Sequence, residues 1–190
     1  MQIDITPLAD LGVATLPPDI VWLRADGTPV APGEYGVRGD FAVASTQAQG
    51  GAGGLVARMP LASAVHLLLW TDAAPPPELL RRFGLRDARG WPGDGFDVDT
   101  ANGEQALGSY FWVYRRAELS VQIGLELQAE AKRALSPLLR QGAVARIVAV
   151  CTIDEVHDRA ALDVGLYARD GTTLYAKRFD PLWDLVRGGL

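Results

Sequence analysis

The sequence is poor in the side chains that most often carry out chemistry. It has one cysteine, Cys151, and two histidines, His66 and His157, among 190 residues. A single cysteine excludes an internal disulfide framework and any metal site built from several cysteines, and it indicates a reducing compartment. Cys151 and His157 lie too far apart along a strand-like segment to form a thiol–base pair. No serine stands in a nucleophile-elbow pattern, so a hydrolytic triad is not expected.

The sequence also lacks an excess of positive charge and a long hydrophobic run. Eighteen basic and 23 acidic residues give a formal net charge of −5, which argues against binding nucleic acid through general electrostatics. The longest apolar run, Leu67–Trp70, is far shorter than the roughly 18 residues of a membrane span. The first residues lack the basic and apolar regions of an export signal. We therefore expect a protein that is not exported and that binds neither nucleic acid nor membrane.

The sequence divides into two parts at about residue 58. Proline and glycine limit residues 1–58 to short elements, such as strands at Ile20–Leu23 and Phe41–Val43. A glycine-rich connector, Gln47–Gly54, follows, and it lacks the spacing of a phosphate-binding loop. We predict an N-terminal arm or small β extension over residues 1–58 and a core over residues 59–190.

The core is predicted to begin with two helices joined by a long loop. Pro60 suits the first turn of a helix that is apolar almost all round, which predicts burial. The segment Ala73–Gly108 is rich in Pro, Gly, Asp and Asn, and a loop of this length is often functional or part of an interface. Ser120 is predicted to cap an amphipathic helix in which Ser136-Pro137 causes a kink or starts another turn and which ends at Gly142. Its water-facing residues are predicted to be Gln122, Glu126, Glu130 and Arg133.

The C-terminal part of the core is predicted to be β. Ile147–Ile153 is apolar on both faces, which is typical of a central strand, and Leu162–Tyr167 alternates between apolar and other residues. The Asp170-Gly171 pair favours a two-residue type I′ turn with positive φ at both positions. This turn predicts three cross-strand pairs: Leu166–Tyr175, Leu162–Phe179 and Asp163–Arg178. The fold class is therefore α+β, with a buried helix, a long loop and an amphipathic helix packed on a three-stranded antiparallel meander.

The acidic loop Asp94–Asp99, followed by Glu104, is a candidate cation site, because hard cations prefer clustered oxygens. An EF-hand that begins at Asp97 fails at three positions, including Gly108 in the place of the last glutamate. An irregular cation site remains an alternative to turn and cap residues. Asp94 and Glu104 could also form the carboxylate pair of a glycosidase, which the sequence cannot place at a catalytic separation.

The segment Tyr110–Arg116 concentrates aromatic residues ahead of two arginines. It could stack on nucleic-acid bases, but the acidic character of the chain argues against this. It could form a strand or turn with one face in the core and two solvated arginines. It could also form a protein interface, since Trp, Tyr and Arg are enriched at interface centres.

Several short segments, in their order along the chain, resemble one phage protein family. Leu67–Asp72 is followed by Arg89–Asp94 and then by Leu107–Trp112 with Arg115-Arg116. This order resembles the baseplate wedge proteins of Mu-like bacteriophages, the gene-product 46 family. The similarity extends over residues 55–185.

The resemblance implies a structural role in a contractile tail. The family is similar to the lysozyme-like wedge proteins of other contractile-tailed phages, which look like sheath initiators. Proteins of that class bind the baseplate wedge and offer strands that the first ring of sheath subunits extends. Strand addition needs no catalyst, because main-chain hydrogen bonds supply affinity and alternate side chains supply specificity. The implied partners are other wedge proteins, tail sheath subunits and the tail tube or hub, and the implied location is the tail baseplate of the virion.

The resemblance also gives candidate partner-binding residues: Trp91, Asp94, Trp112, Arg115, Arg116 and Trp183. Core packing or turn formation is the alternative role for the tryptophans and for the aspartate. Pro92 stands where the family has a second tryptophan, and the Glu-Pro-Arg motif of the lysozyme-like relatives is absent. One of the two arginines is expected to take the place of that motif.

We therefore predict a non-enzymatic baseplate component that needs no cofactor or metal. Two alternatives stay open. One is a cell-wall polysaccharide hydrolase that uses carboxylates of the acidic loop, and the other is a small intracellular adaptor.

Overall fold

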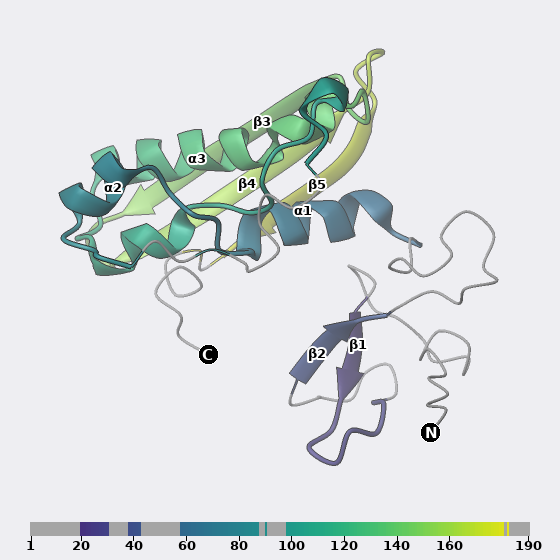
Figure 1. The fold of residues 1–190 in the computed structure, drawn as a ribbon, viewed down its shortest axis with the longest axis horizontal. Coiled ribbons are helices and arrows are strands. Elements are labelled where there is room, and N and C mark those ends of the chain that lie inside the picture. The colour runs from purple at the N-terminus through teal and green to yellow at the C-terminus, as the bar shows by residue number, and fades with distance from the viewer. Residues whose placement is uncertain are drawn as a thin grey trace. The chain divides into compact units, whose positions relative to one another are not determined.

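The computed structural model describes residues 20–30, 38–42, 58–87, 90, 98–180 and 182. The chain forms two compact units, Met1–Ala64 and Val65–Leu190. The division lies within helix α1 (Pro60–Trp70), a few residues after the boundary that the sequence suggested. Figure 1 labels the helices and strands of both units. No helix among the described residues combines the length and the hydropathy needed to cross a membrane.

The first unit contains a β hairpin. β1 (Ile20–Leu23) pairs antiparallel with β2 (Arg38–Phe41). Three apolar side chains next to this pairing are buried: Val21, Leu23 and Ala42. The strand predicted at Ile20–Leu23 is confirmed, whereas the second strand ends at Phe41, where the predicted one begins. The connector Gln47–Gly54 lies outside the described residues.

The second unit is built on a three-stranded antiparallel sheet. Its strands are β3 (Arg146–Asp154), β4 (Arg159–Tyr167) and β5 (Thr173–Phe179), in the order β3-β4-β5. The predicted meander and the α+β class are confirmed. The expectation that Ile147–Ile153 forms a central strand is wrong, because β4 is central and β3 lies at an edge.

The hairpin between β4 and β5 has the predicted register but not the predicted turn. The three expected side-chain pairs are present: Leu162–Phe179, Asp163–Arg178 and Leu166–Tyr175. The loop has three residues, because Ala168 N–H donates to Thr172 O at 2.8 Å and Gly171 N–H donates to Ala168 O at 3.0 Å. Within this loop only Gly171 has a positive φ, +87°, as in a type I turn followed by a bulge. A register shift between Leu166 and Tyr167 compensates for the longer loop.

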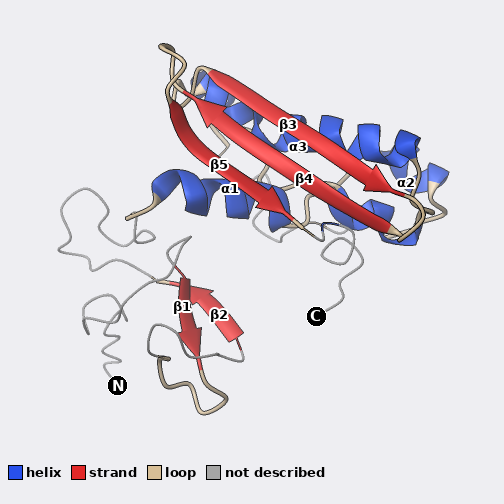
Figure 2. Cartoon of the chain, turned by 180° about the vertical axis from the view of Figure 1, so that it is seen from behind, coloured by secondary structure: helices blue, strands red, loops and turns tan. Residues whose placement is uncertain are grey.

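Helix α3 (Val121–Arg140) runs along β3 on one face of the sheet (Figure 2). Ser120 caps it as predicted, since its hydroxyl accepts a backbone N–H of the first turn. The helix runs through Pro137 and ends at Arg140, close to the end predicted at Gly142. Proline removes the N–H that would bond the carbonyl four residues earlier, which here belongs to Arg133, and the amide of Gln105 donates to that carbonyl at 3.3 Å. The side chains between α3 and the sheet are almost fully buried: Leu127, Leu135, Leu162, Val164 and Leu166.

The segment Ala73–Gly108 is not a loop throughout. It contains the short helix α2 (Pro77–Arg82) and the 3-10 turn η2 (Thr100–Asn102), while residues 88–89 and 91–97 lie outside the described part. The aromatic segment that follows forms a 3-10 helix, η3 (Phe111–Arg116), and neither a strand nor a simple turn. The chain thus brings η3 next to the C-terminal end of α1, where Asp72 and Ser109 form a parallel β bridge.

Candidate partner-binding site

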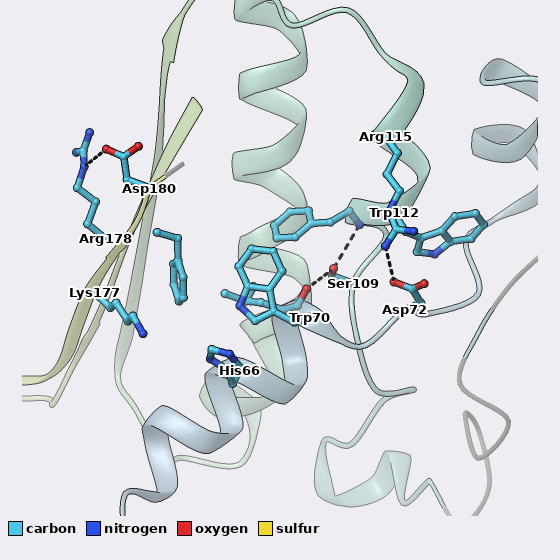
Figure 3. A pocket seen from close by; sticks show the side chains of 12 residues that line it. His66, Trp70, Asp72, Ser109, Trp112, Arg115, Lys177, Arg178 and Asp180 are labelled. Atoms are coloured by element: carbon cyan, nitrogen blue, oxygen red, sulfur yellow. Dashed lines mark hydrogen bonds and ion pairs between the residues drawn. The ribbon is translucent and has the colours of Figure 1, made fainter. Parts of the chain in front are cut away.

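A cavity of about 480 Å³ lies between α1, η3 and β5. Its apolar wall is aromatic, because the ring centre of Trp70 lies 5.7 Å from that of Phe111 and 5.5 Å from that of Phe179. The imidazole of His66 lies one turn earlier on α1, 6.4 Å from the Phe179 ring centre. Figure 3 shows these elements around the cavity, with His66 and Trp70 on the helix and Lys177 and Arg178 on the opposite strand.

Ser109 joins η3 to the end of α1 and so positions one wall of the cavity. Its N–H donates to Thr71 O at 2.9 Å, and its carbonyl accepts from Ala73 N–H at 3.0 Å. Its hydroxyl donates to Leu69 O at 2.6 Å and accepts from Phe111 N–H at 3.3 Å. Ser109 is buried, so these bonds satisfy every polar group that the residue brings into the core.

Glu130 fixes the same segment from α3. Its side chain is 7% exposed, so the prediction that it faces water is wrong. Its carboxylate accepts from the backbone N–H of Tyr110 at 2.6 Å and from the guanidinium of Arg133 at 2.7 and 2.8 Å. Arg133 also donates to Gly108 O at 3.0 Å, and its guanidinium lies 3.9 Å from the centre of the Tyr110 ring. This buried carboxylate, paired with a guanidinium that is 34% exposed, thus attaches the start of η3 to α3.

The four residues that begin η3 are all buried: Phe111, Trp112, Val113 and Tyr114. The indole N–H of Trp112 donates to Ala73 O at 2.9 Å, and the ring is 6% exposed. Tyr114 packs edge-on against Phe83, with ring centres 5.3 Å apart, and burial raises its pKa to about 12. Most of the aromatic surface of this segment therefore packs inside the protein.

Charged side chains surround the mouth of the cavity. Arg115 lies 4.0 Å from Asp72 and is partly exposed. Arg178 bonds Asp163 at 2.8 Å in the predicted cross-strand pair and also contacts Asp180 at 3.4 Å. The ammonium of Lys177 lies 5.3 Å from the centre of the Phe179 ring. The lining carries the cations Arg115, Lys177 and Arg178 and the carboxylates Asp72 and Asp180, so positive charge is in excess. Such an apolar cavity can accept an apolar side chain that neighbours a carboxylate.

A model of the family described as "Phage protein GP46" matches residues 61–173, more than half of the chain. The chain belongs to this phage protein family. No curated protein and no solved structure shows significant similarity to it. The part of this GP46-family chain that matches includes η3, α3 and most of α1, and it stops before Lys177 and Phe179 of the cavity.

The structure of this GP46-family protein brings together two of the six predicted site residues. Trp112 and Arg115 both line the cavity, the first through a mostly buried ring and the second at the mouth. Arg116 ends η3, and nothing is described of its side chain. The remaining three candidates, Trp91, Asp94 and Trp183, lie outside the described residues.

Sequence reasoning missed several residues of the cavity. By sequence, Trp70 is one apolar residue of a buried helix and Lys177 is one residue of the strand after the Asp170-Gly171 turn, because each contributes to the cavity only through the tertiary fold. Ser109 carried no motif of its own. A signal did exist for Trp70, since it belongs to the segment Leu67–Asp72 on which the family resemblance rests.

The described residues give no support to a thiol–base pair, whereas Asp94 of the carboxylate pair considered from the sequence lies outside them. Cys151 is half-buried, and burial raises the pKa of its thiol to about 11, so it is not an activated nucleophile. His157 contacts Asp154 at 2.7 Å instead. Asp99 caps η2, and Glu104 accepts the N–H of Asp99 at 2.8 Å, which agrees with turn and cap roles. Within the described part of the chain, no group of three His, Cys, Asp or Glu residues is placed to hold a metal ion.

Stability is expected to depend on pH through His66. Burial, with a smaller contribution from the charge of Lys177, lowers the pKa of His66 below its ordinary value of 6.5. As the pH falls below about 6.5, the imidazole of His66 is therefore protonated in the unfolded chain before it is protonated in the folded protein. The stability associated with neutral His66 is thus fully present above that pH and is lost below it. We expect the wild type to lose more unfolding free energy than His66→Gln between about pH 7.5 and 5.

Urea unfolding of both proteins at several pH values measures this difference. Carboxylates titrate in both proteins and cancel in the comparison. The lowered pKa of His66 would be contradicted if the difference in unfolding free energy between the two proteins stayed constant with pH. It would also be contradicted if the wild type became relatively more stable as the pH falls.

Proposed function

We propose that this phage protein is a non-enzymatic structural component of a contractile tail baseplate, where it binds wedge proteins and initiates sheath assembly by strand addition. Membership of the phage protein GP46 family supports a role in the phage particle. The observation that carries the finer proposal is the outer edge of β3, with which no strand among the described residues pairs. An edge strand with unpaired backbone groups can pair with a strand of another chain.

The backbone of β3 directs part of its hydrogen-bonding groups away from the sheet. Cys151 N–H donates to the side-chain oxygen of Gln128 at 3.2 Å, so it points away from β4. Backbone groups of an antiparallel strand point alternately to its two sides. Those of Ile147, Ala149 and Ile153 therefore also point to the open side, where a strand of a partner could accept and donate bonds.

β3 is better suited to strand addition than the other edge of the sheet. It has no charged residue between Arg146 and Asp154, and its pairing with β4 runs without interruption. β5, in contrast, carries Lys177 and Arg178 and has an irregularity in its pairing with β4. Charges and bulges are the features by which proteins protect edge strands from pairing with other chains.

The cavity supplies a second surface, on the opposite edge of the sheet. We assign it to the wedge side of the assembly, because it contains Arg115, one of the two arginines of which one is expected to take the place of the wedge-binding motif. The sheath subunits would then bind at β3. The tail tube or hub is a further candidate partner, and the proposed location is the tail baseplate of the virion.

Cryo-electron microscopy of the assembled tail tests this proposal. Density for this chain at the junction of baseplate and first sheath ring, with a sheath strand added to its sheet, would support it. Absence of the chain from purified tails would contradict it. Zymography on cell-wall substrate separates the hydrolase alternative, because a templating protein produces no clearing.

Arg115→Glu is expected to abolish incorporation into baseplates while leaving the fold intact. The substitution replaces the cation at the mouth of the cavity with an anion next to Asp72, so a partner carboxylate would be repelled. Arg169→Glu is the matched control, because Arg169 is exposed in the hairpin loop, away from the residues of the cavity. Immunoblots of purified tails and circular dichroism of the free proteins measure the two effects. Normal incorporation of the Arg115 variant would contradict the proposal that the cavity binds wedge proteins.

A further inference from the structure

One flank of α3 exposes large apolar side chains. Val121 is 63% exposed, Leu125 55% and Leu139 41%. Side chains three, four, seven or eleven positions apart share one side of a helix, so these residues lie on the same flank as Gln128 and Lys132. The opposite side of α3 carries buried groups such as Glu130. Apolar exposure on α3 is thus confined to a single stripe, which we call the α3 flank.

The α3 flank faces the open edge of β3. Gln128 belongs to this stripe, and its side chain reaches the outward N–H of Cys151. Gly124 lets the helix approach the end of β3 closely, because a Cβ at this position would lie 2.5 Å from a side-chain carbon of Ile153. Figure 2 shows α3 running along β3 behind the sheet, so the flank lies beside the space that an added strand would occupy.

We infer that the α3 flank selects the strand that is added to β3, by packing against aliphatic side chains at every second position of that strand. This inference rests on the proposed function and extends it by naming the partner chemistry. A neighbouring strand would lie about 4.8 Å from β3, and alternate side chains would point to the face that α3 covers. Those side chains would meet Val121, Leu125 and Leu139. A strand with polar residues at the same positions would leave the apolar flank exposed.

The backbone of the added strand would replace the side chain of Gln128 at Cys151. A single amide covers only one of the outward groups of β3, and a strand can bond all of them. The occupant we infer is therefore an extended segment of a sheath subunit, uncharged on one face, and not a helix laid along α3. A helix could cover the apolar flank, but it would leave the outward backbone groups of β3 without partners.

The test uses the full chain and the purified sheath subunit of the same phage. Leu125→Glu should weaken binding at least tenfold, because it places a charge where aliphatic side chains pack. Met59→Glu is the control, since Met59 is also a large exposed apolar residue, 44% exposed, but precedes α1. It should leave the affinity unchanged. Both positions are exposed, so both variants are expected to fold, which thermal unfolding checks.

Hydrogen–deuterium exchange on the complex identifies the occupant. Strand addition predicts that the amides of Ile147, Ala149 and Ile153 become protected on binding. Loss of affinity in Leu125→Glu without protection of β3 would indicate a docked helix and overturn the inference, as would unchanged affinity of that variant. A wild-type chain that does not bind sheath subunits at all would overturn the proposed function itself, and the inference with it.

Discussion

Glu130→Ala is expected to lower the free energy of unfolding by about 2 kcal/mol, since it removes the charged acceptor of the Tyr110 N–H and the partner of the partly exposed Arg133 guanidinium. The carboxylate is 7% exposed and holds both the guanidinium of Arg133 and the N–H of Tyr110. Without it, the N–H of Tyr110 loses its acceptor, and Arg133 loses the carboxylate that holds it over the Tyr110 ring. The start of η3 should then detach from α3.

Asp163→Ala is the matched control for this variant. Asp163 also forms an ion pair at close distance, 2.8 Å from Arg178, but both side chains are about half exposed. Such pairs contribute between about 0 and 1 kcal/mol. Urea denaturation measures both variants against the wild type. Losses of the same size in the two variants would show that burial does not strengthen the Glu130 pair.

Gly108→Ala is expected to cost about 3 kcal/mol or more, because the added carbon has no space and no compatible backbone conformation. At this position φ is +106°, and a Cβ would lie 2.3 Å from Thr71 O and 2.9 Å from Thr71 C. These are backbone atoms at the end of α1, so they cannot move aside as a flexible side chain can. The bridge between Ser109 and Asp72 should break, and the cavity should change shape with it.

Gly142→Ala separates the steric overlap of the added carbon from the cost of the backbone conformation. Gly142 also has a positive φ, +73°, but its Cβ would meet nothing within 4 Å. Its free energy of unfolding should fall only by the cost of that backbone conformation, about 1 kcal/mol. Thermal and urea unfolding of both variants give the comparison, and near-ultraviolet circular dichroism reports on Trp70 and Trp112 at the cavity. Equal losses would mean that the close approach to Thr71 does not determine the cost.

Helices α1 and α3 of the core could be predicted because local sequence signals determine where they begin. Ser120 ahead of an apolar periodicity predicts α3, and Pro60 predicts the start of α1, because caps and periodicity act within a few residues. The way in which α3 accommodates Pro137 could not be predicted. It depends on the amide of Gln105, which is distant in sequence and supplies the bond that the proline removes.

The same limit explains the errors at Glu130 and in the hairpin. By periodicity Glu130 belongs to the polar face of α3, and its burial depends on Tyr110, which the sequence does not place. The pairs expected across the hairpin are correct although the turn is not, because the irregularity between Leu166 and Tyr167 offsets the longer loop. The apolar pattern of β4 determines which of its residues face the core, and the register shift between Leu166 and Tyr167 keeps them there.

The candidate site was predictable only in part. The cluster of aromatic residues ahead of Arg115 marks η3 as unusual, and both Trp112 and Arg115 do line the cavity. Whether an aromatic residue faces a partner or the core depends on packing, and the rings of η3 turned inward. The opposite wall comes from β5, which is far away in sequence, so no local pattern could join Lys177 to the site.

The order β3-β4-β5 places the open edge and the cavity at opposite sides of one sheet. In the proposed assembly, tension from a strand held at β3 would reach a partner at the cavity across two hydrogen-bond ladders in series. The first ladder pairs every residue of β3 with β4, whereas the second is interrupted between Leu166 and Tyr167. Of the two ladders within this subunit, the one between β4 and β5 is then the mechanically weaker.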